Sequence, residues 1–412
     1  TTETCTAWRE WLSSVLSKRL MHKEEALHFL NQHINRRLTR ENIDDTSLRN
    51  MQALLHLLGD PQLDFPILHI TGTNGKGSTS AFASNLFAAM GLKVGTYSSP
   101  HVSSISERIQ INTDPIIDDE FSDLISHLAL VEPALEITPS WFELMTAAAF
   151  RCFADNAVDL AVVEVGMLGR FDATNIADAK VSVITNVGYD HTDGSQDWRQ
   201  RLAWEKAGII KKGCILCLGE TDEDLEEVFL AESPQTVLRR NVDFECSEND
   251  LAVGGRHLQL RTMSKTYENI FLAQHGWHQG NNASIALAAV EAFLDSPIPD
   301  EVVKMVSMVR ERVGPNVKLM FDPNCGYDYR KALDVGQALD GNGFYWYEDP
   351  VSHFDLDAIA ELTRRLKVPI CMSDQPDNQF YWGANALRTR SNRLLRGSAA
   401  KLGITGLKKL CS

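Results

Sequence analysis

The stretch Ile67-Leu-His-Ile-Thr-Gly-Thr-Asn-Gly-Lys-Gly-Ser-Thr79 decides the fold of this chain. It begins as an apolar run, becomes a glycine-rich turn, and leads into an apolar, helix-forming segment. Gly72, Gly75 and Gly77 lack a Cβ atom, so the backbone can curl with its N–H groups facing an anion, and the next helix adds its positive N-terminal end. Lys76 adds a point charge. The pattern predicts a strand, a phosphate loop and a helix, with an ordinary strand-to-helix turn as the alternative.

Length and composition limit the classes of protein to consider. The 412 residues suffice for two or three domains, and a hydrophobic fraction of 44% with 23% charged residues is ordinary for a globular protein. A net charge of −15 argues against nucleic acid as a partner, so small molecules are the expected partners, and the lack of a long apolar stretch argues against a membrane. The eight cysteines show no paired pattern, and Cys214-Ile-Leu-Cys217 fits a strand better than a metal or redox site. With no long apolar stretch and no signal-peptide layout, we expect a cytoplasmic location.

Helical and strand patterns alternate along the chain. Residues 1–22 predict an amphipathic helical extension, and residues 24–58 predict two further helices. The alternation of polar and apolar residues over 237–272 predicts a small β-rich segment. Residues 276–294 predict another amphipathic helix.

Polar residues follow several of the predicted apolar strands. Ser99 follows one of them, Glu164 lies near the end of an almost wholly apolar strand, and His191 comes shortly after the next strand. A buried parallel strand has no use for a carboxylate unless its charge is paired or metal-bound. The carboxyl ends of parallel strands form the ligand edge of an open α/β sheet, so Glu164 and His191 predict a Mg²⁺ cradle beside a phosphate. A pair of capped strand ends is the alternative.

Taken together, these landmarks resemble the folylpolyglutamate synthase / dihydrofolate synthase family of Mur-type ligases over residues 24–298. Six motifs in order carry the resemblance: Thr71-Gly-Thr-Asn-Gly-Lys-Gly-Ser78; Tyr97-Ser-Ser-Pro-His101 with Glu107-Arg-Ile109; Glu164-Val-Gly166 with Gly169-Arg-Phe-Asp-Ala-Thr-Asn175; Asp190-His-Thr192; Glu205-Lys-Ala-Gly-Ile-Ile210; and His278-Gln279 with Asn282-Ala283. The resemblance implies a central domain with a phosphate loop and a mostly parallel sheet.

The resemblance also implies a role for individual residues. The nucleotide contacts would come from Thr73, Asn74, Gly75, Lys76, Gly77, Ser78 and Asn282. The ligands of Mg²⁺ would be Ser99, Glu164 and His191, with Lys206 carbamylated to hold a second Mg²⁺, and the residues implied to be catalytic are Lys76, His191 and Lys206. The implied chemistry is transfer of the γ-phosphoryl group of ATP to a folate carboxylate, followed by attack of the glutamate amine on the acyl phosphate. For Lys206 the alternative is a lysine near a helix end that contacts the last carbonyls or solvent.

The chain departs from the family pattern in three places. Leu168 stands where the family's Glu-Val-Gly-x-Gly-Gly run has a glycine, and residues 193–198 lack the usual Leu-Gly. The motif Asp-Gly-Ala-His-Asn-Pro, which opens the family's C-terminal domain, does not occur.

The sequence after about residue 300 resembles another family, the mandelate racemase-like members of the enolase superfamily. Asp322, Glu348 and Asp374 each end an apolar strand and are separated by 26 residues, the length of one βα unit. Three carboxylates at successive strand ends of a parallel barrel would converge on one Mg²⁺. The segment spans about four βα units. The strand that would bring the family's Lys-x-Lys base lies upstream of the point where the resemblance begins, and the final strands are missing.

We therefore expect an α/β chain with three parts: a helical extension at 1–22, an ATP-binding domain of Mur-ligase type at 23–298, and a partial (β/α) barrel at 299–412. The expected activity is that of an ATP- and Mg²⁺-dependent folate–glutamate ligase of folate and one-carbon metabolism, acting as a monomer on folate, glutamate and ATP. The alternatives are a non-catalytic ATP-binding module and a Mg²⁺-dependent sugar-acid dehydratase or racemase that uses Asp322, Glu348 and Asp374. The chain reads as a fusion of a nearly complete ATPase module with a barrel fragment.

Overall fold

A computed structural model of the chain describes residues 21–34, 45–188, 197–252, 255–274, 276–307, 320–321, 326–341, 345–352, 354–372 and 394–395. All but the last two residues of the expected helical extension at 1–22 lie outside these ranges. The chain forms two compact units. The first consists of Thr1–Cys246, Leu260–Tyr267 and Asn281–Val306, and the second of Ser247–Gln259, Glu268–Gly280 and Ser307–Ser412.

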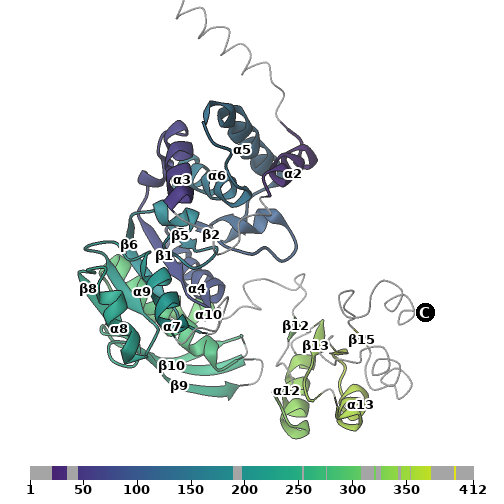
Figure 1. The fold of residues 1–412 in the computed structure, drawn as a ribbon. Coiled ribbons are helices and arrows are strands. Elements are labelled where there is room, and N and C mark those ends of the chain that lie inside the picture. The colour runs from purple at the N-terminus through teal and green to yellow at the C-terminus, as the bar shows by residue number, and fades with distance from the viewer. Residues whose placement is uncertain are drawn as a thin grey trace, which may run out of the picture. The chain divides into compact units, whose positions relative to one another are not determined.

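The first unit is built on an eight-stranded sheet with the order β4-β3-β2-β5-β1-β6-β7-β8 (Figure 1). Its strands are β1 (Ile67–Thr71), β2 (Val94–Tyr97), β3 (Ile109–Ile111), β4 (Asp114–Pro115), β5 (Leu160–Glu164), β6 (Ala179–Ile184), β7 (Ile215–Leu218) and β8 (Thr236–Arg239). The strands from β2 to β8 in this order are parallel, and β3 and β4 add an antiparallel edge. The expected mostly parallel sheet is confirmed.

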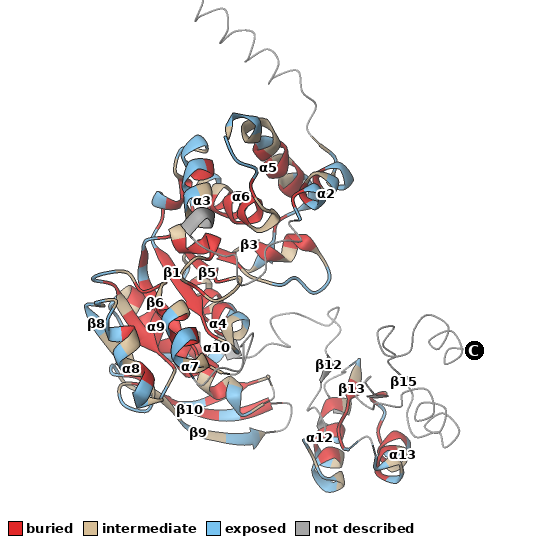
Figure 2. Cartoon of the chain, in the orientation of Figure 1, coloured by how far each residue is buried: buried red, intermediate tan, exposed pale blue. Residues whose placement is uncertain are grey.

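Helices cover both faces of this sheet, so its central strands read as continuous apolar runs. Every residue of β1 and β5 is buried, as the red strands in Figure 2 show. The α-helices are α2 (Lys23–Gln32), α3 (Asp45–Leu57), α4 (Lys76–Ala89), α5 (Asp118–Val131), α6 (Trp141–Asp155), α7 (Trp198–Ala207), α8 (Glu223–Leu230), α9 (His278–Leu294) and α10 (Asp300–Ser307). Short 3₁₀ turns are η2 (Pro61–Leu63), η3 (Ile105–Arg108), η4 (Glu132–Ala134) and η5 (Ala173–Ile176).

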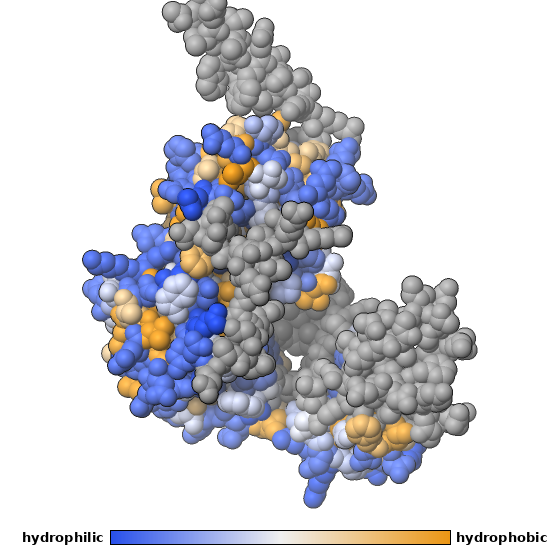
Figure 3. Space-filling view, viewed as in Figure 1, coloured by the Kyte–Doolittle hydropathy of each residue, from blue (hydrophilic) through white to orange (hydrophobic). Residues whose placement is uncertain are grey.

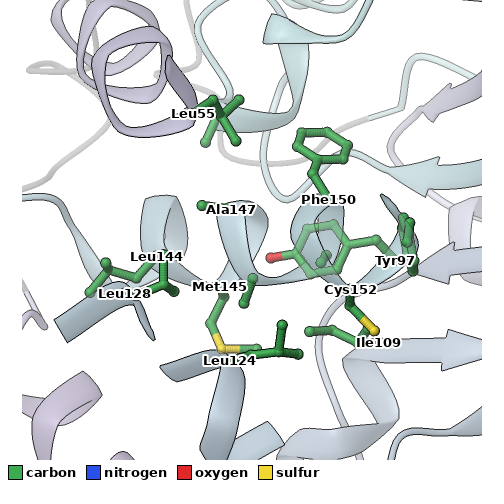
Figure 4. Close-up of a cluster of buried hydrophobic side chains, with 14 of the residues drawn as sticks. Leu55, Tyr97, Ile109, Leu124, Leu128, Leu144, Met145, Ala147, Phe150 and Cys152 are labelled. Atoms are coloured by element: carbon green, nitrogen blue, oxygen red, sulfur yellow. The ribbon is translucent and has the colours of Figure 1, made fainter. Parts of the chain in front are cut away.

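One large apolar cluster joins α2, α3, α5 and α6 to the sheet. Figure 4 shows its centre, where the ring of Tyr97 lies beside α6 with Met145, Phe150 and Ile109 around it. Helix α6 starts at a defined residue because the Ser140 hydroxyl accepts a hydrogen bond from the Glu143 amide and the Glu143 carboxylate accepts one from the Ser140 amide. Each fully buried leucine or phenylalanine of the cluster stabilises the fold by about 1.5–3 kcal/mol.

The phosphate-loop helix α4 packs on the central strands β1, β2 and β5. An edge contact between Phe87 and Phe293, with ring centroids 5.2 Å apart, joins α4 to α9. Helices α7 and α8 pack on β6 and β7 through a second cluster that includes Leu202, Leu216 and Phe229. These contacts join α4 to α9 and fix α7 and α8 on β6 and β7.

Two expectations about local structure are confirmed in the middle of the chain. The polar, alternating segment forms a three-stranded sheet of order β11-β10-β9, with β9 (Glu245–Ala252), β10 (Gly255–Arg261) and β11 (Thr266–Leu272). Cys217 is a buried residue of β7, and the buried Cys214 immediately precedes that strand. The Cys214–Cys217 run is therefore part of a strand in the core.

The C-terminal part of the second unit carries a parallel four-stranded sheet of order β12-β13-β14-β15. Its elements are β12 (Met320–Phe321), α12 (Tyr329–Gly341), β13 (Trp346–Glu348), α13 (Leu356–Arg365), β14 (Ile370–Met372) and β15 (Leu394–Leu395). Tyr347, Ile359, Leu362 and Ile370 form its apolar core with their neighbours. Neighbouring strands in sequence order, with a helix between β12 and β13 and between β13 and β14, are the pattern of a (β/α) barrel segment, as expected.

The surface in Figure 3 mixes hydrophilic and apolar side chains over the described residues of the first unit. None of the helices in the described part of the chain combines the length and the apolar character needed to cross a membrane.

A histidine lies in the core of the central strand. His69 of β1 is fully buried, and its Nε2 lies 2.9 Å from the Thr174 hydroxyl oxygen. That hydroxyl donates to Asp172 at 2.5 Å, so it accepts from His69, and the imidazole proton belongs on Nε2. His69 Nδ1 has no hydrogen-bond partner among the described residues. Burial, with a smaller contribution from the charge of Lys211, lowers the pKa of His69 to about 3.

We predict that His69 makes the fold sensitive to acid. The unfolded chain binds a proton at this residue below about pH 6.5, whereas the folded chain does so only near pH 3. The stability associated with neutral His69 is thus present above pH 6.5 and falls by about 1.4 kcal/mol per pH unit as the pH drops toward 3. In His69→Gln, where the side-chain amide can still donate to Thr174, the melting temperature should decline less between pH 7 and pH 4.5.

The exposed His28 provides the matched control. His28→Gln should leave the pH dependence of the melting temperature unchanged. Equal slopes for the parent chain and His69→Gln would contradict the assignment of acid sensitivity to the buried imidazole.

Candidate active site

The glycine-rich loop occupies the predicted place between a buried strand and a helix N-terminus. Strand β1 ends at Thr71, and α4 begins at Lys76 with Gly75 as its N-cap at φ 83°. A Cβ atom on Gly75 would lie 2.4 Å from Oδ1 of Asn282, and one on Gly72 would lie 1.8 Å from Oγ1 of Thr185. Neither position has room for a side chain, so both glycines are required by close approach.

The end of β6 holds the loop in place. Asn186 accepts hydrogen bonds from the Thr73 amide through its carbonyl (3.0 Å) and from the Asn74 amide through Oδ1 (3.1 Å). The Thr185 hydroxyl and the Asn186 side-chain amide donate to the Asn74 carbonyl at 2.6 and 2.8 Å. Our sequence interpretation did not assign Thr185 and Asn186 to the site. The signal was the pair of polar residues at the end of an apolar strand beside the loop.

Lys76 and Gly77 open the helix as expected for a phosphate loop. The Lys76 ammonium donates to the Gly72 carbonyl at 2.9 Å and to the Thr73 carbonyl at 3.4 Å, so the charge lies over the loop. A Cβ atom on Gly77 would lie 3.7 Å from Oε2 of Glu164, which shows how closely the helix start approaches that carboxylate. Ser78 follows in the first turn of α4.

Glu164 is a buried carboxylate at the end of β5, with 2% of its surface exposed. Burial raises its pKa to about 7, against the opposing effects of the Ser99 N–H and the positive charges of Lys76 and Arg108. The Ser99 amide donates to Glu164 Oε2 at 3.2 Å. The structure therefore brings together Ser99, Glu164 and the start of α4, which were predicted to meet at the carboxyl edge of the sheet.

Lys206 and Asn282 are buried near the ends of their helices. Lys206 is the last residue but one of α7 and is only 3% exposed, which excludes the alternative of a solvent-facing lysine. Asn282 is 6% exposed and lies in the first turns of α9, where its side chain meets Gly75. His191, the third expected ligand of the first metal ion, lies outside the described residues.

The donor set that the structure describes fits a hard cation. Glu164 supplies a buried carboxylate and Ser99 a hydroxyl group, both oxygen donors of the kind that Mg²⁺ prefers. A carboxylate whose pKa is raised by burial gains from a neighbouring cation, because the cation offsets the cost of its desolvated charge. Within the described ranges, no three His, Cys, Asp or Glu side chains form a cluster that could hold a metal ion.

Leu168, the departure from the family pattern, has a left-handed backbone at φ 63°. Its carbonyl accepts a hydrogen bond from the Thr71 hydroxyl at 2.6 Å, which ties the loop after β5 to the end of β1. A left-handed conformation costs a non-glycine residue about 1–2 kcal/mol, and the side chain recovers part of that by packing on the cluster around α7 and α8. The backbone thus keeps a glycine-like conformation without the glycine.

Of the alternative metal ligands in the C-terminal segment, only Glu348 is described. It ends β13, is 5% exposed, and its Oε2 accepts a hydrogen bond from the Trp346 indole at 3.2 Å. Asp322 and Asp374 lie outside the described residues.

A glycine loop between a buried central strand and a helix, with a buried acid at the end of the next parallel strand, defines a phosphate-loop α/β domain of the Mur-ligase type. The solved structure of Mycobacterium tuberculosis folylpolyglutamate synthase complexed with ADP is similar to this chain with a TM-score of 0.67 and 30% sequence identity, covering 97% of this chain and 91% of that one. In the part that carries the phosphate loop, the chain belongs to the folylpolyglutamate synthase / dihydrofolate synthase family.

Curated proteins match a shorter part of the chain. The dihydrofolate synthase/folylpolyglutamate synthase of Mycobacterium tuberculosis is 40% identical over 269 residues, which is 60% of this chain and 55% of the relative. The Bacillus subtilis protein of the same name is 34% identical over 256 residues, or 59% of each chain. The chain therefore spans little more than half the length of these curated relatives.

The C-terminal segment matches a different family. A family model described as Enolase C-terminal domain-like matches residues 280–412, in agreement with the resemblance seen in the sequence.

We predict that Gly75→Ala destabilises the fold more than Gly91→Ala does. The two glycines have nearly the same φ, 83° and 85°, but a Cβ atom meets the buried Asn282 at the first and open space at the second. Both variants carry the conformational cost, and Gly75→Ala adds an overpacking cost of about 1–2 kcal/mol. The difference is measured as the free energy of unfolding in urea. Equal losses would show that Asn282 does not pack on the loop.

Proposed function

We propose that the chain is an ATP- and Mg²⁺-dependent carboxylate–amine ligase that adds glutamate to a folate through an acyl phosphate. The observation that carries the proposal is the juxtaposition of the phosphate loop with the buried Glu164 and with Ser99. Phosphoryl transfer from a nucleotide needs a site that binds the phosphates next to oxygen ligands that can bind Mg²⁺. The loop provides the first, and Glu164 with Ser99 the second.

The proposed roles combine the positions of the described side chains with the roles that the family resemblance implies, and those of His191 and Lys206 rest on the resemblance. Loop amides and Lys76 bind the phosphates, and Asn282 contacts the nucleotide from α9. Ser99, Glu164 and His191 would hold one Mg²⁺, and a carbamate on Lys206 would help to hold a second. The cations, when bound, spread the negative charge of the transferring phosphoryl group. A cation beside Lys206 also favours the neutral amine that reacts with CO₂.

The named relatives support this substrate class. The curated relatives carry the names of dihydrofolate and folylpolyglutamate synthases, and the solved M. tuberculosis structure contains ADP. Because the chain spans little more than half of those curated relatives and lacks Asp-Gly-Ala-His-Asn-Pro, a binding module without turnover is the competing function. We further propose the division into 1–22, 23–298 and 299–412, a monomeric state and a cytoplasmic location.

We predict that Lys206→Ala removes most ATP turnover and leaves nucleotide affinity within about twofold of the parent. The measurement is phosphate release from ATP in the presence of dihydropteroate or a reduced folate with glutamate, beside binding of a fluorescent ATP analogue. Short-chain carboxylates should restore part of the turnover, because they can replace the missing carbamate ligand.

Lys212→Ala is the matched control, because Lys212 is exposed and lies just beyond the same helix. It should behave like the parent chain. Turnover of Lys206→Ala at the parent rate would exclude the second-metal role, and nucleotide binding with no folate-dependent phosphate release by the parent chain would leave only a binding module.

A second candidate function rests on the C-terminal segment. Its parallel strands, the buried Glu348 and the match to the Enolase C-terminal domain-like family support a Mg²⁺-dependent sugar-acid dehydratase or racemase. Proton abstraction beside a carboxylate needs a positioned base as well as a metal ion, and the segment lacks the family's Lys-x-Lys strand.

We predict no dehydration of a panel of sugar acids by the parent chain. Activity that is lost at least 100-fold in Glu348→Gln would reverse the ranking of the two functions, because that change removes a metal-ligand charge but keeps the size of the side chain.

A further inference from the structure

The C-terminal end of α7, which carries Lys206, is held by a loop that begins at Glu164. A helix leaves its last carbonyl groups without intrahelical partners. Here the Arg170 guanidinium donates to the Trp204 carbonyl at 2.9 Å, and the Arg170 amide donates to the Glu205 carbonyl at 2.7 Å. The guanidinium also lies over the Trp204 indole, 4.0 Å from its centroid, and pairs with Glu232.

Asn175 ties this loop to the residue that follows the helix. Its side-chain amide donates to the Arg170 carbonyl at 2.8 Å and to the Gly208 carbonyl at 2.9 Å. The Lys211 ammonium donates to the Asn175 side-chain oxygen at 2.9 Å and to its backbone carbonyl at 2.8 Å. Because an ammonium group can only donate, it fixes the orientation of the amide, whose two N–H groups then face the two carbonyls.

Two glycines allow the loop and helix to come this close. A Cβ atom on Gly208 would lie 2.4 Å from Cα of Arg170. One on Gly169 would lie 2.8 Å from the Glu205 carbonyl oxygen and 3.2 Å from Cα of Lys206. The loop therefore lies against the backbone of Glu205, Lys206 and Gly208.

The same loop is braced from within as it leaves Glu164. The Asp172 carboxylate accepts hydrogen bonds from the Met167 amide at 2.9 Å and the Thr174 amide at 3.0 Å. Met167 follows strand β5 and Thr174 lies in the 3₁₀ turn η5, so these two hydrogen bonds link the beginning of the connection to its end. A short, internally hydrogen-bonded connection thus runs from Glu164 to Asn175.

We propose that Asn175, assisted by Arg170, is a positioning residue that fixes the backbone of Lys206 relative to Glu164, so that the two side chains can each serve their own Mg²⁺ of the proposed pair. The inference rests on the proposed function, which places both side chains around Mg²⁺. Groups that orient a metal ligand without touching the metal typically change metal affinity by 10–100-fold when they are replaced. Asn175 acts on the backbone around the ligand, so its effect should appear in metal binding while the phosphate loop is unaffected.

Asn175→Asp tests this with a side chain of the same shape. The new oxygen replaces the donor that faces the carbonyls of Arg170 and Gly208, so two attractive contacts become repulsive while the contact with Lys211 is kept. Asn156→Asp is the matched control. That amide also donates to a helix carbonyl, Cys152 at 3.1 Å, and to Glu120 at 2.9 Å, but Asn156 is the C-cap residue of α6.

Two measurements on the full chain decide the matter, and neither requires turnover. The first is hydrogen exchange of the amides at the end of α7, which should become at least tenfold faster in Asn175→Asp and stay unchanged in Asn156→Asp. The second is the affinity for Mn²⁺, followed by electron paramagnetic resonance in the presence of a non-hydrolysable ATP analogue. It should fall at least tenfold in Asn175→Asp, with affinity for the analogue itself within twofold of the parent.

The outcomes separate this inference from the proposed function. Faster exchange with unchanged Mn²⁺ affinity would make the loop a purely structural brace and overturn the inference, as would unchanged exchange. Mn²⁺ affinity that falls equally in the control would attribute the effect to lost stability and also overturn it. If both expected changes occur and the parent chain releases no folate-dependent phosphate, the positioning role stands and the ligase activity does not.

Discussion

The hydrogen bonds between the end of β6 and the phosphate loop are the contacts on which the candidate site depends. Thr185 and Asn186 hold the backbone of Thr73 and Asn74 from the neighbouring parallel strand. A loop of small residues has many conformations in the unfolded chain, and an anion cradle requires one of them. The sheet therefore fixes the conformation of the loop through Thr185 and Asn186, which follow the last residue of β6. The positive N-terminal end of the α4 dipole then faces a loop of defined conformation.

Two ionisable side chains of the candidate site are buried, and burying a charge is costly unless that charge is compensated. Glu164 is 2% exposed and Lys206 is 3% exposed. Desolvation favours the neutral form of Glu164 and so raises its pKa. Groups with perturbed protonation concentrate at functional sites because the fold keeps them where a ligand can compensate for the cost. The hydrogen-bonded loop from Glu164 to Asn175 restrains the backbone at both Glu164 and Lys206, so neither side chain can leave its buried position easily.

The second unit poses a different physical problem. The four described strands of its C-terminal part form a parallel sheet with a core of its own, but parallel sheets of this kind are normally closed into barrels. The short strands β12 and β15 lie at the edges of that sheet. Among the described strands, β12 and β15 each pair with a single neighbour, and an uncovered sheet edge can pair with another chain.

Much of the fold followed from the sequence because local patterns carry it. The apolar runs of β1 and β5, the glycines of the loop and the polar excursion after β8 each produced the expected element. The sequence also predicted that Glu164 lies at a strand end, because a carboxylate in the middle of a buried apolar strand would have its charge uncompensated. Only the tertiary structure decided which groups meet there. The pairing of Asn186 with the loop, the burial of Lys206 and the contacts of Asn175 with α7 join residues far apart in the chain, and no local pattern encodes distances between them.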